Sequence, residues 1–440
     1  MPDAESVVGS TRAGNRAPEA ARARAGESKS VWELASRAKR ASGDLARASS
    51  AVKEKALRIA AGLLEKDADR LLAANAGDLA QAEADGVAPA ALDRLRLDGG
   101  RISSMAEGLR DVAALADPVG EVVDGWVRPN GLRIERVRVP LGVIGIIYEN
   151  RPNVTADAAG LCLKSGNAAA LRGSSTALRS NRAIVEVLRK ALSESGLSAD
   201  CVVLVDDVSR EAAATFMQLN GLVDCLIPRG GPSLIASVME NATVPVVIDG
   251  DGNCHVYVDR DADLEMAGSI LVNAKMQRPG VCNAAESLVV HSDVAEAFLP
   301  AAAEALSGVE LVGDDEACRI LPGIGRANAE DFGREYLALK MSVAVVPSLD
   351  AAISHINSYG TGHSEAIVTR NVAAAERFLH EVDAAAVLVN ASTRLVDGGQ
   401  LGLGAEIGIS TQKLHARGPM GLRELTCVKW IIRGDGQLRQ

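Results

Sequence analysis

Aromatic side chains are scarce in this chain: Phe, Trp and Tyr make up 2% of its 440 residues, against 48% hydrophobic residues. Alanine and valine must therefore fill much of the interior, which suits close packing of helices on sheets. No apolar run approaches the roughly 18 residues of a membrane-spanning helix, so we expect no association with a membrane. A chain of this length predicts two or three domains.

Closely spaced cysteine pairs are also missing. The seven cysteines are scattered and form no CxxC pair, which argues against a disulfide framework and a zinc site and favours a reducing cytoplasm. The six histidines show no HExxH or similar spacing, so we predict no metal.

Positive charge is in deficit, with a net charge of −10. This balance argues against nucleic-acid binding, although local clusters of Arg, Lys and helix N-termini can still hold an anionic substrate. Residues 1–28 are rich in Ala, Arg and Gly and lack the apolar centre of a signal peptide. We predict a disordered tail there, with a targeting role as the alternative.

The pattern of apolar residues changes along the chain. Helices are expected near 31–47, 51–75 and 89–115, and Asn75 and Gly77 sit where the second could end. Pro-Asn-Gly at 129–131 lies between two alternating runs and predicts a hairpin over 119–139.

From Pro140 onward, short apolar strands alternate with helices, which predicts an α/β fold with parallel sheets covered on both faces. The expected strands are 141–147, 168–172, 201–205, 223–227, 244–248, 254–258, 286–291, 343–346, 365–369, 386–390 and 426–433. The expected helices between them are 176–195, 209–220, 232–240, 263–276 and 371–381.

One cysteine stands out as a candidate nucleophile. Cys282 follows Pro279-Gly280, a pair that predicts a turn, and Lys275 and Arg278 lie just upstream. Nearby cations favour the thiolate, which is the reactive form in covalent catalysis. The alternative is a buried structural cysteine.

Two loops could hold phosphates. Arg172, Gly173 and Ser174 join a predicted strand to a predicted helix, and Arg172 beside Ser174 would suit the 2′-phosphate of NADP. Gly230, Gly231 and Ser233 repeat the theme, with Ser233 as a helix cap. The alternative for each loop is an ordinary capped turn. The GxGxxG fingerprint of dinucleotide-binding loops is absent.

Several motifs resemble those of the aldehyde dehydrogenase superfamily, and most closely the gamma-glutamyl phosphate reductases of proline biosynthesis. The resemblance covers roughly residues 30–440. The motifs are Tyr-Glu-Asn-Arg-Pro-Asn-Val-Thr at 148–155, Lys-Ser-Gly-Asn at 164–167, Arg-Pro-Gly-Val-Cys-Asn at 278–283, Gly-His-Ser at 362–364, and the run from Gly404 to Pro419.

The resemblance implies two Rossmann-like domains with parallel sheets and a small β element for oligomerisation. We expect the cofactor-binding domain in 29–118 and 140–253, the catalytic domain in 254–425, and the oligomerisation hairpin and strand in 119–139 and 426–440. It further implies a homodimer or homotetramer, and a glutamate 5-kinase as a partner that supplies the substrate.

The resemblance also implies roles for single residues. Cys282 matches the nucleophile and Asn153 the side-chain donor of the oxyanion hole. Lys164, with Arg172 and Glu335, is assigned to the cofactor, where Glu335 would hold the nicotinamide ribose; its alternative is an exposed charge. The candidate substrate anchors are Arg278, His363, Arg394 and Arg417, each with a surface charge as the alternative. His363 follows a Gly-Thr-Gly loop, which argues against a packed core histidine, and it could protonate the leaving phosphate if it faces the site.

The activity implied is NADPH-dependent reduction of L-glutamyl 5-phosphate to L-glutamate 5-semialdehyde and phosphate through a cysteine thioester. The glutamate that activates water in aldehyde-oxidising relatives is replaced here by a segment in which only Asp249 or Asp251 could substitute. The alternatives are a CoA-dependent or hydrolytic aldehyde dehydrogenase and, outside catalysis, a scaffold that keeps the fold.

Overall fold

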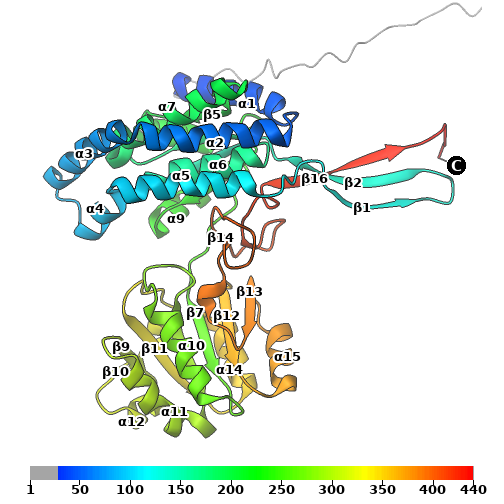
Figure 1. Cartoon of the computed structure of the whole chain (residues 1–440). Coiled ribbons are helices and arrows are strands. Elements are labelled where there is room, and N and C mark those ends of the chain that lie inside the picture. The colour runs from blue at the N-terminus through cyan, green and yellow to red at the C-terminus, as the bar shows by residue number, and fades with distance from the viewer. Residues whose placement is uncertain (1–27, 440) are drawn as a thin grey trace, which may run out of the picture.

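The computed structural model describes residues 28–439, which form two lobes and a protruding arm (Figure 1). The tail expected at 1–28 lies, apart from Ser28, outside the described residues. None of the helices among the described residues is both long and apolar enough to cross a membrane.

The first lobe is a four-stranded parallel sheet with helices on both faces (Figure 1). Its strands are β3 (Val143–Tyr148), β4 (Ala168–Arg172), β5 (Val202–Leu204) and β6 (Cys225–Arg229). Its helices are α1 (Lys29–Leu45), α2 (Ser50–Lys66), α3 (Ala68–Ala84), α4 (Pro89–Leu95), α5 (Gly99–Ala114), α6 (Asn153–Lys164), α7 (Leu178–Ser195), α8 (Arg210–Met217) and α9 (Pro232–Asn241), with 3₁₀ turns η1 (Ser175–Ala177) and η2 (Ala199–Cys201).

The strand order β5-β4-β3-β6 creates a switch point between β3 and β6. The chain passes from β3 outward to β4 and β5 and then returns to the other side of β3. In open α/β sheets, ligands bind in the crevice beyond the carboxyl ends of the strands at such a point. The crevice here lies beyond Tyr148 and Arg229, which are register partners.

Two expectations for this lobe are wrong. The stretch 244–248 is not a strand and makes only an isolated bridge from Val246 to Leu226. Asn75 does not end a helix but lies inside α3, where its buried amide bonds the Leu95 carbonyl (2.8 Å) and the Leu97 N–H (2.7 Å). Asn75 thus supplies hydrogen bonds to the backbone that follows α4. From sequence alone, such a buried asparagine cannot be told from one that ends a helix.

The second lobe is a seven-stranded parallel sheet in the order β10-β9-β11-β8-β7-β12-β13. Its strands are β7 (Cys254–Val258), β8 (Ala285–His291), β9 (Glu310–Gly313), β10 (Gly325–Arg326), β11 (Lys340–Val346), β12 (Ser364–Val368) and β13 (Ala386–Val389). Its helices are α10 (Leu264–Met276), α11 (Ser292–Ala305), α12 (Asp315–Ile320), α13 (Ala329–Phe332), α14 (Leu349–Tyr359) and α15 (Val372–Glu381), with the 3₁₀ turn η3 (Thr393–Leu395).

Both faces of this sheet are buried. Along β7, Val256 packs in the core beneath α10 and α11, and the next residue, Tyr257, packs in the core beneath α14 and α15. Alternation of this kind is expected when side chains point to opposite faces and helices cover both. The α/β fold predicted from the sequence is therefore confirmed.

The arm is a three-stranded antiparallel sheet that projects from the first lobe (Figure 1). It consists of β1 (Val122–Val127), β2 (Arg133–Pro140) and the distant β16 (Thr426–Arg433). The hairpin predicted from Pro-Asn-Gly is confirmed, with Gly131 in the left-handed region that such a turn requires (φ 88°). Trp126 and Trp430 pack edge to face with ring centres 5.7 Å apart.

Two chain segments connect the lobes and pair with each other. Asp249 in the first connection bridges Ser410 in the second, and the Gly250 N–H donates to the Ile409 carbonyl at 3.0 Å. The short strands β14 (Ile409–Ser410) and β15 (Gly418–Pro419) follow. Within 407–425, buried residues such as Met420 and Leu425 join the core of the first lobe. The boundary expected at 425 therefore does not coincide with the boundary between the cores.

Candidate active site

The carboxyl edge of the first-lobe sheet and the amino edge of the second-lobe sheet face each other across the cleft between the lobes. Arg229, at the carboxyl end of β6, pairs with Asp249 in the connection, so the carboxyl edge of the first sheet faces the second lobe. Strand β7 starts just after that connection, so the second sheet presents its amino edge to the first lobe. Cys282 lies at this amino edge, in the loop between α10 and β8.

The backbone of Cys282 is closely enclosed. Gly252 packs against it so tightly that a Cβ on Gly252 would overlap the carbonyl group of Cys282. The buried thiol of Cys254 donates to the same carbonyl at 3.2 Å. Cys282 as a residue is half-buried, so the loop is held in place without being fully enclosed.

The electrostatic environment of the thiol differs from the sequence-based expectation. Burial raises the pKa of Cys282 to about 12, Asp249 adds to the rise, and Arg229 opposes it. Lys275 does not supply the expected nearby cation, because its ammonium is wholly buried in a 2.6 Å ion pair with Glu286. Arg278 is exposed, and its guanidinium has no hydrogen-bond or ion-pair partner within residues 28–439.

Asn153 is placed on the first-lobe side of the cleft. It is the first residue of α6, directly after the loop that leaves the carboxyl end of β3. Its exposed amide donates to Asp157 at 3.0 Å. One of its two amide N–H groups is thus held by the helix, and the other is available to an oxygen in the cleft.

The switch-point crevice holds the second glycine loop. A Cβ on Gly230 would come within 2.7 Å of the Glu149 carboxylate, and that carboxylate accepts the Gly231 N–H at 2.9 Å. An acidic side chain therefore occupies the N-terminus of α9. Ser233 does not cap this helix as expected, because α9 starts at Pro232 and its N-cap is Gly231.

The first glycine loop is held mainly by contacts within the protein. Arg172 donates to the carbonyl of Ser209 (3.1 Å), and Ser174 donates to Asn150 (2.9 Å). Gly173 has no room for a side chain because the amide of Asn181 lies against it. The loop lies at the carboxyl edge of the sheet, where a cofactor is expected.

Lys164 lies on the wrong edge for the cofactor role expected of it. It ends α6, and the end of a crossover helix returns to the amino edge of the sheet, opposite the glycine loops. Its ammonium is wholly buried and bonds Glu54 and the Ala113 carbonyl, both at 2.9 Å. This is a structural role in joining α6 to α2 and α5.

Glu335 lies beside the nucleophile loop. One carboxylate oxygen accepts the N–H of Gly252 at 2.9 Å, and Gly252 in turn contacts Cys282. Burial raises the pKa of Glu335, and the Gly252 N–H opposes the rise. The side chain is half-buried, and its second oxygen has no hydrogen-bond partner within the described residues.

Two residues expected to bind the substrate, His363 and Arg417, have other partners in the structure. His363 is 0% exposed, 3.6 Å from the Cys254 thiol, and burial lowers its pKa to about 4. It is therefore a neutral histidine beneath the site and does not face it. Arg417 pairs with Asp383 at 2.9 Å, which also binds Lys413.

Arg394 stays close to the nucleophile. Its guanidinium donates to Gln277 at 2.9 Å and to Asn283, the residue after Cys282. The amide of Asn283 donates in turn to the Val396 carbonyl at 2.8 Å. Arg394 thus holds the nucleophile loop in place. Burial lowers the pKa of Arg394, and the nearby positive charge of Arg278 lowers it further.

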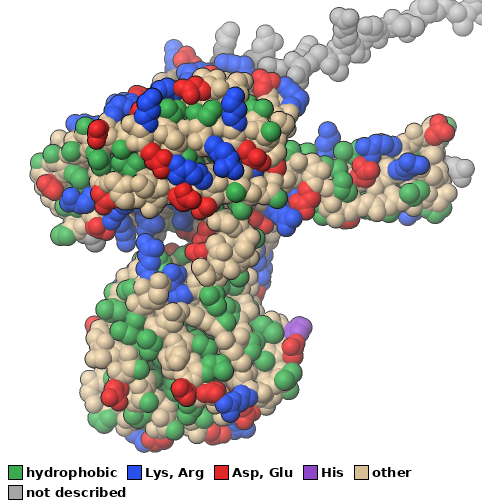
Figure 2. Space-filling view, viewed as in Figure 1, with side chains coloured by type: hydrophobic (Ala, Val, Ile, Leu, Met, Phe, Trp, Pro, Cys, Tyr) green, Lys and Arg blue, Asp and Glu red, His purple; other side chains and the backbone are tan. Residues whose placement is uncertain are grey.

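Arg151 is the residue that the sequence interpretation missed. It is exposed, lies two residues before Asn153, and has no hydrogen-bond or ion-pair partner within residues 28–439. Burial lowers its pKa, and the neighbouring Arg94, Arg229 and Arg278 lower it further. Figure 2 shows Lys and Arg side chains gathered where the lobes meet. The sequence signal that could have identified Arg151 is its position inside the motif Asn150-Arg151-Pro152-Asn153.

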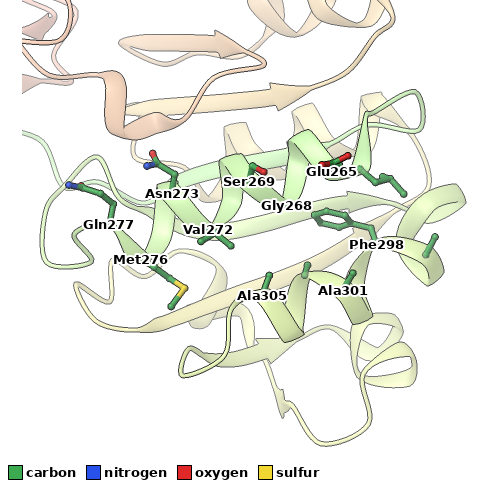
Figure 3. A pocket seen from close by; sticks show the side chains of 13 residues that line it. Glu265, Gly268, Ser269, Val272, Asn273, Met276, Gln277, Phe298, Ala301 and Ala305 are labelled. Carbon is green, nitrogen blue, oxygen red and sulfur yellow. The ribbon is translucent and has the colours of Figure 1, made fainter.

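An apolar groove on the second lobe is not the site of the chemistry. It is a groove of about 890 Å³ between α10 and α11, with Val272, Met276 and Phe298 among its lining (Figure 3). Its walls are mostly apolar and contain neither cysteine nor arginine. The reactive groups instead gather in the interlobe cleft.

Comparison with known proteins is consistent with this architecture. The sequence profile described as "Aldehyde dehydrogenase family" matches residues 12–337. The chain belongs to the aldehyde dehydrogenase family. Members of this family use a nicotinamide cofactor, and the chain is an oxidoreductase of that family.

Its relatives narrow the assignment. The gamma-glutamyl phosphate reductase of Clostridium beijerinckii is 57% identical over 404 residues, covering 91% of this chain and 98% of the relative. That of Caldanaerobacter subterraneus is 54% identical over 408 residues, covering 92% and 99%. Within the family, the chain therefore belongs to the gamma-glutamyl phosphate reductases, as its motifs predicted.

Solved structures agree. The gamma-glutamyl phosphate reductase of Thermotoga maritima has a TM-score of 0.91 and 48% identity, covering 93% of this chain and 100% of that one. An acetylating aldehyde dehydrogenase from Geobacillus thermoglucosidasius, with a TM-score of 0.67 and 15% identity, shares the fold alone.

Proposed function

We propose that this chain reduces L-glutamyl 5-phosphate to L-glutamate 5-semialdehyde and phosphate, a step of proline biosynthesis, with Cys282 as the nucleophile. The observation that carries the proposal is a partly exposed cysteine, Cys282, that shares its charged neighbours Asp249 and Arg229 with Arg151, which is itself near Arg278. Its relatives at up to 57% identity bear the name of this activity.

The first step is acyl transfer to sulfur. The Cys282 sulfur bonds to the acyl carbon, the carbon–oxygen bond to phosphate breaks, and the departing phosphate takes the thiol proton. Asn153 and the backbone N–H of Cys282 stabilise the oxyanion of the tetrahedral intermediate. Such a donor is worth about 3–4 kcal/mol in the transition state.

The cofactor site proposed here lies in the switch-point crevice. A ligand that uses Gly230 and Gly231 would take the place of the Glu149 carboxylate, and the second oxygen of Glu335 is the proposed acceptor for a ribose hydroxyl. Arg172 and Ser174 are the proposed contacts for the additional phosphate of NADP. When bound, reduced nicotinamide supplies the hydride that converts the thioester carbonyl to the aldehyde level.

We propose that the unpaired arginines bind the phosphate and the carboxylate of the substrate. Arg151 and Arg278 carry charge with no internal partner in the described chain, so each can bind a phosphate or carboxylate without breaking an existing ion pair. Arg394 contributes by holding Asn283 next to the sulfur.

The state of Asp249 supports reduction over hydrolysis. Its carboxylate is bound by Arg229 and accepts the Ile409 N–H at 2.7 Å, so it is not free to activate water. Asp251 is exposed and makes no hydrogen bond with the described residues. Asp249 is therefore excluded as a water-activating base, and Asp251 is the remaining candidate of the two.

The assembly proposed is a homodimer or homotetramer formed through the arm. Its strand β1 is exposed along its whole length, and Trp126, Val127, Trp430 and Ile432 are large apolar side chains left uncovered. An exposed edge strand with apolar side chains is a ready template for pairing with another chain, which we propose is a second copy of this protein. A glutamate 5-kinase that hands over the acyl phosphate, and a cytoplasmic location, remain predictions.

The test is the reverse reaction. Purified protein is mixed with glutamate 5-semialdehyde, NADP⁺ or NAD⁺, and phosphate, and absorbance of the reduced cofactor is followed. We expect turnover that requires phosphate, prefers NADP⁺ and disappears in Cys282→Ala. Turnover with water or CoA in place of phosphate would instead identify a hydrolytic or CoA-dependent enzyme.

A further inference from the structure

A wholly buried ion pair closes the base of the nucleophile loop. Lys275 is the second-last residue of α10 and Glu286 the second residue of β8, so the pair spans the two ends of the segment that carries Cys282. The ammonium and carboxylate are 2.6 Å apart, and both side chains are 0% exposed. Neither residue is positioned to touch the substrate.

The second oxygen of Glu286 reaches a different segment. It accepts the N–H of Leu337 at 3.2 Å, where the backbone is in the left-handed region (φ 52°). Few side chains other than glycine adopt this conformation without cost, so an external contact must hold it. The turn at Leu337 also faces Gly280 of the nucleophile loop.

That turn lies two residues after Glu335. Glu335 accepts the N–H of Gly252, and Gly252 lies against the Cys282 backbone. Hydrogen bonds thus link Lys275 to Glu286 and Glu286 to Leu337, and the chain leads from Leu337 to Glu335, which reaches the Cys282 backbone through Gly252.

The cost of burying this pair argues that its role is geometric. A buried ion pair often stabilises a fold no better than apolar side chains of similar volume. A carboxylate, however, can bond two groups at once, and here it bonds the end of α10 and the Leu337 turn.

We infer that the Lys275–Glu286 pair is a positioning device that sets Cys282 and Glu335 relative to each other. The inference rests on the proposed function, in which Cys282 attacks the acyl carbon and Glu335 holds the cofactor. Both residues act through others, so they are positioning residues and not catalytic ones.

Two double variants separate charge from geometry. Lys275→Met/Glu286→Gln removes both charges but keeps an oxygen that can accept the Leu337 N–H. Lys275→Met/Glu286→Leu removes the charges and the acceptor. We expect the first to keep kcat within about threefold of wild type and the second to lose about tenfold or more, since small misplacements of reacting groups have effects of this size.

The readouts are chosen to exclude a merely structural effect. In the leucine variant, KM for the nicotinamide cofactor should rise severalfold while KM for phosphate is unchanged, because only Glu335 and the thiol are displaced. The control is Lys53→Met/Asp117→Leu, which removes a 2.5 Å ion pair in the first lobe between a buried lysine and a partly exposed aspartate. It should lower Tm without this KM split.

A third variant covers failure of the leucine variant to fold. Leu337→Pro keeps the ion pair but removes the N–H that Glu286 accepts and cannot adopt the left-handed backbone, and because this side chain is 42% exposed, the variant should fold and still lose severalfold in kcat. If the leucine variant folds with wild-type kcat and cofactor KM, or if it fails to fold and Leu337→Pro has wild-type kinetics, the inference is wrong. Turnover in Cys282→Ala would instead overturn the proposed function.

Discussion

Gly252 lies directly on the peptide group of Cys282, with no space for even a methyl group between the two backbones. Gly252 also donates its N–H to Glu335 at 2.9 Å. A residue without a side chain is therefore the contact between the nucleophile and the carboxylate assigned to the cofactor.

Replacing Gly252 by alanine should displace the nucleophile loop. We expect Gly252→Ala to lower kcat by about a hundredfold, the order associated with a shift of about 1 Å in a reacting group. The control is Gly62→Ala in the exposed part of α2, where nothing lies within 4 Å. That change should raise stability by about 0.5–1 kcal/mol, since alanine is the better helix former. Equal kcat in both variants would contradict the contact.

The raised pKa of Cys282 predicts a slow thiol in the protein without ligands. Because burial moves the pKa to about 12, the thiolate fraction should grow about tenfold per pH unit from pH 7 to pH 10. Alkylation by iodoacetamide, followed by mass spectrometry in a Cys427→Ser background that removes the exposed cysteine, should rise accordingly. A plateau of the rate below pH 8 would disprove the environment described here.

Removing the unpaired guanidinium of Arg151 should weaken anion binding selectively. We expect Arg151→Ala to raise KM for phosphate in the reverse reaction by about tenfold or more, corresponding to roughly 1.5–3 kcal/mol for a charged hydrogen bond. KM for the nicotinamide cofactor should change little. Arg319→Ala, which breaks surface ion pairs on α12, is the control and should leave both constants unchanged. A matching rise in both KM values for Arg151→Ala would argue for a general disturbance of the cleft.

The neutral His363 predicts a specific loss of stability in acid. Its pKa is lowered to about 4 in the folded chain, from an ordinary value near 6.5, by burial. The folded state thus resists protonation, so the stability from neutral His363 is complete above about pH 6.5 and is lost as pH falls toward 4. Between pH 7.5 and 5 the loss should be about 2 kcal/mol. Urea unfolding of wild type and His363→Asn at both pH values should show a loss smaller by that amount in the variant; equal losses would contradict the assignment.

The sequence predicted the sheets well because their signal is local. Buried parallel strands are short apolar runs, and β4 and β7 occupy the ranges expected for them, 168–172 and 254–258. Helix α11 was not given a range, since its alanine-rich sequence with an internal proline shows little periodicity. The break between α2 and α3 at Asp67 was missed because neither glycine nor proline marks it.

The site was harder to predict because it depends on which sheet edge a residue reaches. Lys164 belongs to a diagnostic motif, yet it ends α6 at the edge opposite the glycine loops. Lys275 lies seven residues before Cys282, but its charge is taken by Glu286, a residue that no spacing rule connects to it. His363 follows a flexible-looking Gly-Thr-Gly loop and is nonetheless 0% exposed. Sequence spacing gives proximity along the chain, whereas ionisation and access depend on tertiary burial.

The paired connections between the lobes limit how the cleft can move. Asp249 and Ser410 lie on the two segments that cross it, and the bonds between these segments make them a single two-stranded strap. A rotation of one lobe must bend both segments about the same line. The expected motion is therefore a hinge opening about that line and not a twist of one lobe against the other. Substrate and product would then exchange at the side of the cleft farthest from the connecting segments, while Cys282 moves with the second lobe as part of it.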